Sequence, residues 1–159
     1  MNNKIVMATI TIMLLVLTTG CNHQDNNKEQ SRLSLLKATN PAPIELSSRP
    51  GHKSIGYQVR KDVNKIPDIY DTAVIEGKKE VIVAYKVKHL QRFRMRKIEK
   101  AISKKLKEEY PKEHFIVSSD YKIFLEAIKL KDDLDHNNLS NKEAEKRFKK
   151  IIKLKKEMS

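Results

Sequence analysis

The chain contains a single cysteine, Cys21, and no tryptophan among its 159 residues. A lone cysteine cannot close a disulfide within the chain, and without a second thiol there is no cysteine pair to bind zinc. The sequence therefore excludes an internal disulfide framework and a thiolate metal centre. The one thiol needs a different role.

Catalytic motifs are also missing. The four glycines form no phosphate-cradling loop, and neither a His-Glu-x-x-His nor a Gly-x-Ser-x-Gly motif occurs. The carboxylates Asp68 and Asp71 are expected to flank a turn, where Asp is common. We expect no enzyme, no cofactor and no metal site; turnover of a substrate analogue would revive the enzyme alternative. The five histidines are scattered along the chain: His23, His52, His89, His114 and His136.

One stretch partly imitates a calcium-binding loop. Asp133, Asp135 and Asn137 match the first, third and fifth ligand positions of such a loop. The twelfth position, which requires a bidentate glutamate, is Ala144. The pattern therefore favours an acidic loop between two helices, without a metal ion.

Long hydrophobic runs are absent apart from one near the start. This run extends from Ile5 to Leu17, about thirteen residues, whereas a membrane-spanning helix needs roughly twenty. Lys4 precedes the run, and the small residues 18 to 20 follow it directly before Cys21. A basic start, a short apolar run and small residues are typical of a signal peptide.

The position of Cys21 after small residues resembles the bacterial lipobox, in which the thiol receives diacylglycerol and becomes the amino terminus of a lipoprotein. The usual lipobox has leucine three residues before the cysteine, but here Thr18 holds that position and Leu17 precedes it. We predict a lipoprotein signal peptide over residues 1–20 and lipidation of Cys21 with fatty acids such as palmitate. The alternative is an ordinary secretory signal that is cleaved elsewhere.

Residues 21–53 are predicted to form a lipidated flexible tether. They are rich in Asn, Gln, Ser and Pro, and Pro41, Pro43 and Pro50 prevent a continuous helix. A flexible tether of roughly thirty residues would have a reach on the order of 30 Å.

Residues 54–134 are predicted to form a small α+β domain with the order αββαβα and a three-stranded sheet packed by helices. Apolar residues at helical spacing predict a helix from Ser54 to Ile66. Alternating β-rich runs over residues 69–77 and 78–88 predict a hairpin whose second strand is central and covered by helices on at least one face.

The second half of this domain is predicted to contain two more helices and one strand. The helix over residues 90–109 should bury Met95, Ile98, Ile102 and Leu106. A short strand is expected from His114 to Ser118. The oxygens of Ser119 and Asp120 should then cap a helix that runs through Leu134.

A basic amphipathic C-terminal helix is predicted over residues 140–158. Ser140 and Glu143 fit a capping box, and an apolar stripe includes Phe148 and Ile151. One interpretation is a solvated helix that packs this stripe on the domain; the other is a helix that binds a membrane surface or partner. The candidate residues for binding an anionic surface are Lys146, Arg147, Lys149, Lys150 and Lys153.

The net charge of the chain is +13, and Lys4 is the only charged residue among residues 1–20. The remaining chain thus carries 32 basic and 20 acidic residues, a net charge of +12. Such a charge favours an anionic partner, either acidic lipid headgroups or negatively charged envelope polymers. Nucleic acid is an alternative through the basic helix over residues 92–107, but predicted export and the absence of a GXXG loop argue against it.

Several segments of residues 55 to 134 resemble the YhcN/YlaJ family of sporulation lipoproteins. The similar segments are KDVNKIPDI, TAVIEG, VIVAYKV, RKIEKAISKKLKE and FIVSSDYKIFLEAI. The resemblance implies a protein made in the developing forespore, exported, lipid-anchored at the spore inner membrane or in the cortex region, and active in germination or outgrowth. It implies no enzymatic activity, and the helix from Ser140 lies outside the family core.

The combined expectation is a lipid-anchored, non-enzymatic spore-envelope protein that binds or organises anionic envelope material or partner proteins. A self-assembling scaffold or regulatory module is the first alternative, suggested by the apolar stripe of the last helix. A nucleic-acid-binding basic protein is the second.

Overall fold

The computed structural model describes residues 38–46 and 53–158. Cys21, the predicted signal peptide and most of the predicted tether lie outside the described residues. The described elements are, in chain order, β1 (Ile44–Glu45), α3 (Gly56–Asn64), β2 (Ile69–Glu76), β3 (Glu80–Val87), the 3-10 helix η1 (His89–Arg94), α4 (Met95–Glu109), β4 (His114–Ser118), α5 (Tyr121–Asp135) and α6 (Asn141–Glu157).

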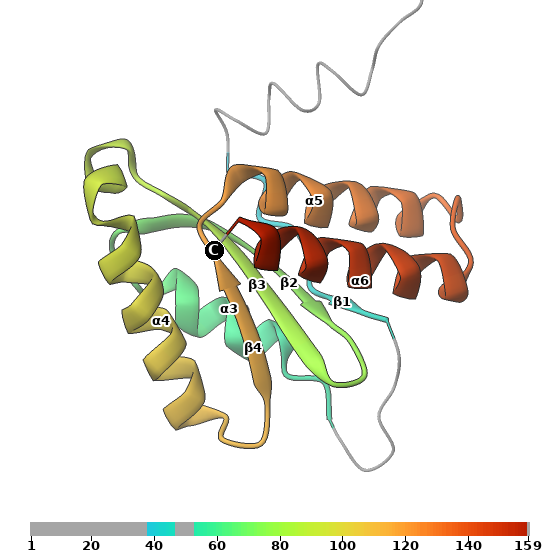
Figure 1. The fold of residues 1–159 in the computed structure, drawn as a ribbon, viewed down its shortest axis with the longest axis horizontal. Helices are drawn as coiled ribbons and strands as arrows, with labels where there is room; N and C mark the ends of the chain where they lie inside the picture. Colours follow the sequence, from blue (N-terminus) through green and yellow to red (C-terminus); the bar gives the residue numbers. More distant parts are fainter. Residues whose placement is uncertain (1–37, 47–52, 159) are drawn as a thin grey trace, which may run out of the picture. The chain divides into compact units, whose positions relative to one another are not determined.

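The protein has an α+β fold with a four-stranded mixed sheet in the order β1-β2-β3-β4 (Figure 1). The predicted hairpin is confirmed, since β2 and β3 pair antiparallel, and both outer pairs are parallel. The prediction of three strands is wrong, because β1 pairs Ile44 with Ile75 and Glu45 with Glu76. A strand of two residues between prolines is too short to show the period of two from which strands are recognised.

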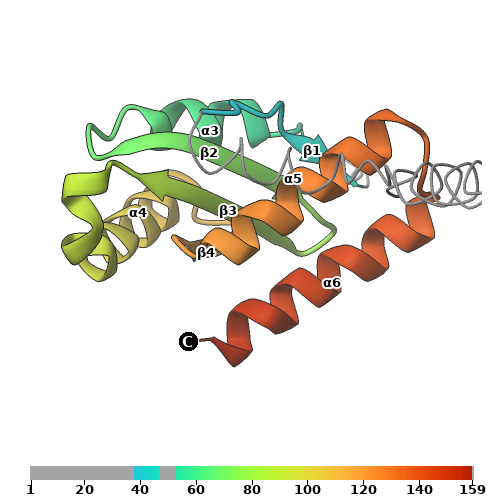
Figure 2. The ribbon, with the colours of Figure 1, turned by 90° about the horizontal axis from the view of Figure 1, so that it is seen from above.

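Helices cover both faces of the sheet because successive strand residues point to opposite sides. On one face, Ile82 and Ala84 of β3 pack with residues of α5 and α6. On the other face, Val83 and Tyr85 pack with residues of α3 and α4. Figure 2 shows α3 and α6 on opposite sides of the strands. The prediction of a central strand covered by helices is therefore confirmed.

The last helix belongs to this core. Ser140 and Glu143 form the predicted capping box, and Phe148 and Ile151 are buried with β2, β3 and α5. The ring of Phe148 lies so close to the hairpin turn that a β-carbon added at Gly77 would be 2.4 Å from it. The C-terminal helix thus shares the hydrophobic core on this face of the sheet with β2, β3 and α5.

The segment before α3 is attached to the sheet through Asp71. This fully buried carboxylate accepts hydrogen bonds from the backbone N–H of Thr39 at 2.7 Å and of Asn40 at 3.0 Å. It also forms an ion pair with Lys86, its cross-strand partner, at 2.9 Å. The prediction of Asp71 at a turn is wrong, and the predicted tether is too long at its C-terminal end, because Thr39 to Leu46 contact the sheet.

A second buried carboxylate, Glu76 at the end of β2, caps α3. It accepts hydrogen bonds from Ser54 Oγ at 2.6 Å, from the N–H of Ile55 at 3.2 Å and from the N–H of Gly56 at 2.6 Å. The side chain of Ile55, at the N-cap position, makes no cap hydrogen bond. Because the first N–H groups of a helix lack partners and carry partial positive charge, an anion from a distant strand stabilises this end.

The helix predicted over residues 90–109 is divided into η1 and α4. Ile98, Ile102 and Leu106 are buried as predicted, but Met95 is 36% exposed, so its predicted burial is wrong. Met95 is the first residue of α4 and follows η1, none of whose residues is buried, so it lies at the exposed end of the helix. The predicted cap of α5 is confirmed for Asp120, which accepts from the N–H groups of Lys122 and Ile123.

Asp62 links α3 to the end of α4. Its carboxylate accepts hydrogen bonds from Tyr110 Oη at 2.7 Å, from Lys65 Nζ at 2.8 Å and from Gln58 Nε2. Burial alone raises the pKa of Asp62, but these three hydrogen bonds outweigh it and lower the pKa from 3.8 to about 2. Burial and the hydrogen bond to Asp62 both raise the pKa of the Tyr110 hydroxyl. The ionised carboxylate is therefore the form that the fold stabilises.

Stability should depend on pH through Asp62. Because its folded pKa is below the unfolded value, its contribution is complete above about pH 5 and is lost as the pH falls through about 2. Asp62→Asn should therefore lower the free energy of unfolding by about 2 kcal/mol near pH 7. Urea denaturation should show that this difference shrinks near pH 2.5. The exposed Asp135→Asn should change stability by at most about 0.5 kcal/mol at either pH, and an Asp62→Asn deficit that is independent of pH would contradict the assignment.

Candidate functional site

The exposed side of α6 is a basic surface. Lys146, Lys149, Lys150 and Lys153 are exposed, while the opposite stripe of the helix is buried. We call these four residues the α6 face. The fifth predicted residue, Arg147, is instead half-buried and forms an ion pair with Asp133 of α5. The structure thus places four of the five predicted residues in solvent and directs the fifth to a neighbouring helix.

Each acidic residue of α6 contacts a specific neighbour. Ser140 donates hydrogen bonds that hold the pKa of Glu143 below its ordinary value. Glu145 forms an ion pair with Lys78 at 3.3 Å, and Glu157 forms one with Lys153 at 3.7 Å. Glu143 lies in the first turn, where negative charge is favoured by the helix dipole. The exposed middle of the helix therefore carries lysines and no acid.

A second basic surface surrounds η1 and the start of α4. We call residues 88–97 the η1 tip. Two apolar side chains protrude there, since Leu90 is 79% exposed and Phe93 is 84% exposed. The exposed basic residues of the tip are Lys88, His89, Arg92, Arg94, Arg96 and Lys97.

Sequence reasoning identified the cations of the tip but not its exposed apolar residues. Phe93 lies five residues before Ile98, a spacing that does not belong to the helical stripe of Ile98, Ile102 and Leu106. This spacing was the sequence signal that Phe93 would not be buried with the other apolar residues. It is obscured when residues 90–109 are treated as one continuous helix.

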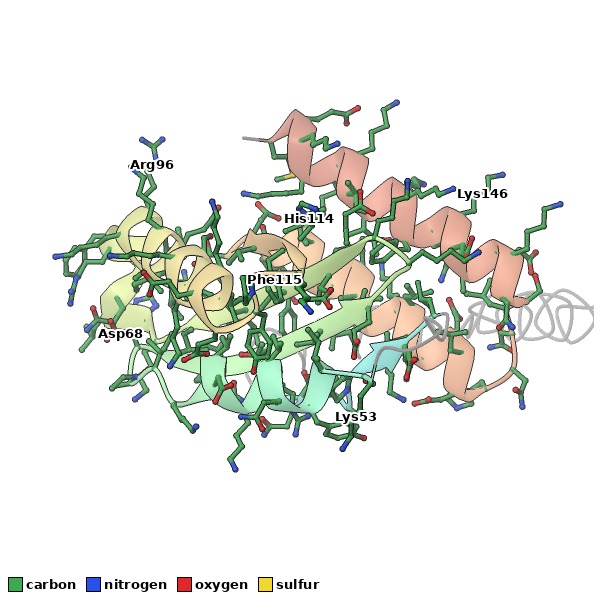
Figure 3. All side chains as sticks on the ribbon, turned by 90° about the horizontal axis from the view of Figure 1, so that it is seen from below. Lys53, Asp68, Arg96, His114, Phe115 and Lys146 are labelled. Carbon is green, nitrogen blue, oxygen red and sulfur yellow. The ribbon has the colours of Figure 1, made fainter. Side chains whose placement is uncertain are left out.

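The two basic surfaces lie on neighbouring elements. Glu99 of α4 accepts a hydrogen bond from Lys155 Nζ of α6 at 2.9 Å. Glu99 also accepts from the N–H of Ser119, in the loop after β4, at 3.3 Å. In Figure 3, Arg96 near the start of α4 and Lys146 on α6 both extend away from the sheet.

Other candidate groups do not converge. His89 lies on η1, His114 on β4 and His136 directly after α5, and all three are exposed; His23 and His52 are outside the described residues. The prediction of an acidic loop at Asp133 and Asp135 is wrong, because α5 continues to Asp135 and both residues lie on this helix. Asp133 pairs with Arg147 and Asp135 pairs with Lys131. Within residues 38–46 and 53–158, no group of three His, Cys, Asp or Glu side chains is arranged to hold a metal ion.

Two further features of the described part concern ligands and membranes. A depression of about 590 Å³ lies along the outside of α3, and all its lining residues come from that helix and Lys65 after it. It therefore lacks a second wall that would enclose a small molecule. None of the described helices is long and apolar enough to span a bilayer.

No protein-family model matches the chain, and comparisons with curated proteins and with solved structures give no match either. The resemblance to sporulation lipoproteins thus rests on the sequence segments alone. What it implies about location and role stays a proposal.

Proposed function

We propose that the protein is a lipid-anchored, non-enzymatic spore-envelope component that binds anionic envelope material through the α6 face. The observation that carries this proposal is the orientation of α6. Its apolar stripe is buried in the core of its own chain, and its lysines face solvent. The charge of the helix is therefore available to a partner.

This orientation also specifies the kind of binding. Because Phe148 and Ile151 are already buried, α6 cannot insert an apolar stripe into a bilayer as an amphipathic helix would. Its attraction to an anionic surface is electrostatic, about 1 kcal/mol for each nearby lysine. Binding through the α6 face should therefore weaken steeply as salt is added.

The place of action follows from the signal-peptide pattern and the family resemblance. The signal-peptide pattern supports export and lipidation at Cys21. The family resemblance supports residence at the spore inner membrane or in the cortex region, with a role in sporulation or germination. Lipid anchorage would hold the basic domain close to anionic headgroups and envelope polymers. Weak electrostatic contacts become effective when an anchor raises the local concentration.

The alternatives have less support from the described residues. Self-assembly was suggested by the apolar stripe of the last helix, which packs inside its own chain. Nucleic-acid binding would use the cations of α4, several of which are exposed. It conflicts with the predicted export of the chain.

A charge-reversal variant tests the α6 face. The triple variant Lys146→Glu, Lys149→Glu, Lys150→Glu should bind anionic vesicles and immobilised polyphosphate about 100-fold more weakly, since at least about 3 kcal/mol of attraction is removed. Binding of the full chain would be measured at low salt.

The matched control reverses three exposed lysines on other elements: Lys61→Glu, Lys79→Glu, Lys112→Glu. Both triple variants change the net charge by the same amount and keep the predicted signal peptide unchanged. The proposal requires a larger loss for the α6 triple. Equal losses would show that binding follows net charge alone and would contradict a role of the α6 face.

A further inference from the structure

The η1 tip exposes a group of large apolar side chains. Of the five large apolar side chains that the described part exposes, three lie within residues 90–95: Leu90, Phe93 and Met95. No residue of η1 is buried. Large apolar side chains grouped on a surface commonly mark an interaction site.

The charged residues of the tip are all basic. Residues 88–98 contain five lysine or arginine residues and no aspartate or glutamate. Arg94 donates a hydrogen bond to Gln91, which is uncharged, at 3.3 Å. The protruding Leu90 and Phe93 are thus surrounded in sequence by cations on both sides.

The backbone of the tip is held by hydrogen bonds at its base. The N–H of Lys88 donates to the carbonyl of Asp68 at 2.8 Å, and the N–H of Gln91 donates to the carbonyl of Lys88 at 2.8 Å. On the other side, Ile98 and Ile102 bury the following helix in the core. The exposed side chains are therefore presented by a fixed turn.

We propose that the η1 tip docks on an anionic phospholipid bilayer, with Leu90 and Phe93 entering the boundary between headgroups and acyl chains. Arg92, Arg94, Arg96 and Lys97 then contact lipid phosphates. This inference deepens the proposed function, on which it rests, by naming phospholipid as one anionic partner and by adding a surface separate from the α6 face.

The combination of side chains distinguishes a bilayer from a soluble polyanion. Cations alone suit any phosphate-rich partner, but Leu90 and Phe93 leave water only if the partner has an apolar phase. Long basic side chains can meanwhile keep their charged ends at headgroup level. A single-stranded nucleic acid could stack on Phe93, yet it offers no comparable apolar environment for Leu90.

The absence of tryptophan from the chain allows a direct test. Phe93→Trp in the full chain introduces one fluorescent reporter at the tip. Tyr57→Trp is the matched control, because Tyr57 is 66% exposed but lies on α3. Emission would be recorded with phosphatidylglycerol vesicles, with phosphatidylcholine vesicles and with soluble polyphosphate.

With phosphatidylglycerol vesicles, the Phe93→Trp reporter should shift to the blue and be quenched by lipids brominated in their acyl chains. The Tyr57→Trp reporter should remain in water. A Phe93→Trp reporter that stays in water while the protein sediments with the vesicles would overturn the inference. An equal blue shift with polyphosphate or a single-stranded oligonucleotide, without bromolipid quenching, would also overturn it and assign the tip to a soluble polyanion.

A second variant separates this inference from the proposed function. Leu90→Ser, Phe93→Ser should weaken vesicle binding at least tenfold and leave polyphosphate binding unchanged. If the proposed function is wrong, the α6 triple will bind both vesicles and polyphosphate as tightly as the unmodified protein, whatever the Phe93→Trp emission shows. If only the tip inference is wrong, the α6 triple will still bind vesicles and polyphosphate more weakly, but Leu90→Ser, Phe93→Ser will bind vesicles normally.

Discussion

Replacing Asp71 with alanine is expected to lower the free energy of unfolding by about 3–5 kcal/mol, because the substitution removes the carboxylate from a buried ion pair. Asp71 is fully buried, and its partner Lys86 is only 6% exposed. The ammonium of Lys86 would remain in the core without the carboxylate that lies 2.9 Å from it. Leaving one charge of such a pair in place is more costly than removing both.

Two aromatic rings also lie close to Lys86. Its Nζ lies 4.6 Å from the ring centroid of Phe124 and 5.0 Å from that of Tyr70. These rings stabilise a cation but supply no countercharge. Asp71→Ala also removes the acceptor of the Thr39 and Asn40 N–H groups, so the segment that contains β1 should detach from β2.

Two measurements test this expectation. Urea denaturation gives the loss in the free energy of unfolding, and hydrogen exchange over residues 39–46 reports detachment of the segment. The double variant Asp71→Ala, Lys86→Met should recover part of the loss, since it removes both charges. Glu108→Ala, which breaks an exposed pair with Lys104, should cost at most about 0.5 kcal/mol. A cost of less than about 1 kcal/mol for Asp71→Ala would show that the pair does not hold the segment.

The structure shows which features could be predicted from sequence. The helices around Val59, Ile102 and Phe148 were predictable because apolar residues recur at helical spacing within each segment. The caps at Asp120 and Ser140 were predictable because an N-cap and its partners lie within three residues of each other. Such signals are local, and they do not depend on how distant parts of the chain meet.

The features that were missed depend on contacts between distant segments. Asp71 binds Thr39, 32 residues away in the sequence, and Glu76 caps α3 from 20 residues beyond Gly56. Neither carboxylate is marked by its neighbours as buried. The short strand β1 likewise exists only because β2 provides its hydrogen-bonding partner.

The candidate site was predicted in part for the same reason. Helical periodicity placed Lys146 and Lys149 opposite the buried stripe, which the structure bears out. The pairing of Arg147 with Asp133 was not predictable, because it requires the packing of α5 against α6. The exposure of Phe93 was missed because a 3-10 turn replaced the expected first turns of the helix.

Replacing Cys21, the predicted site of lipid attachment, is expected to abolish acylation of the protein. Acyl chains contribute about 0.8 kcal/mol for each methylene that they bury, and two chains together anchor a protein stably. Cys21→Ser removes the only thiol of the chain. It should therefore abolish acylation completely, and cells producing this variant should contain no lipid-modified form of the protein.

Serine is the matched replacement because it keeps the size and polarity of the position while removing the nucleophilic thiol. The α6 triple is a useful second control, since its charges play no part in processing and it should be acylated normally. Loss of acylation in both variants would indicate a general defect of export instead of a specific role of Cys21.

The intact mass of the protein recovered from the producing cell shows directly whether Cys21 is the lipidated amino terminus. We expect a chain that begins at Cys21 and carries added fatty acyl mass, and we expect this species to be absent from cells that produce Cys21→Ser. A mature chain that begins at another residue, or an unmodified chain with residues 1–20 intact in the cytosol, would contradict it.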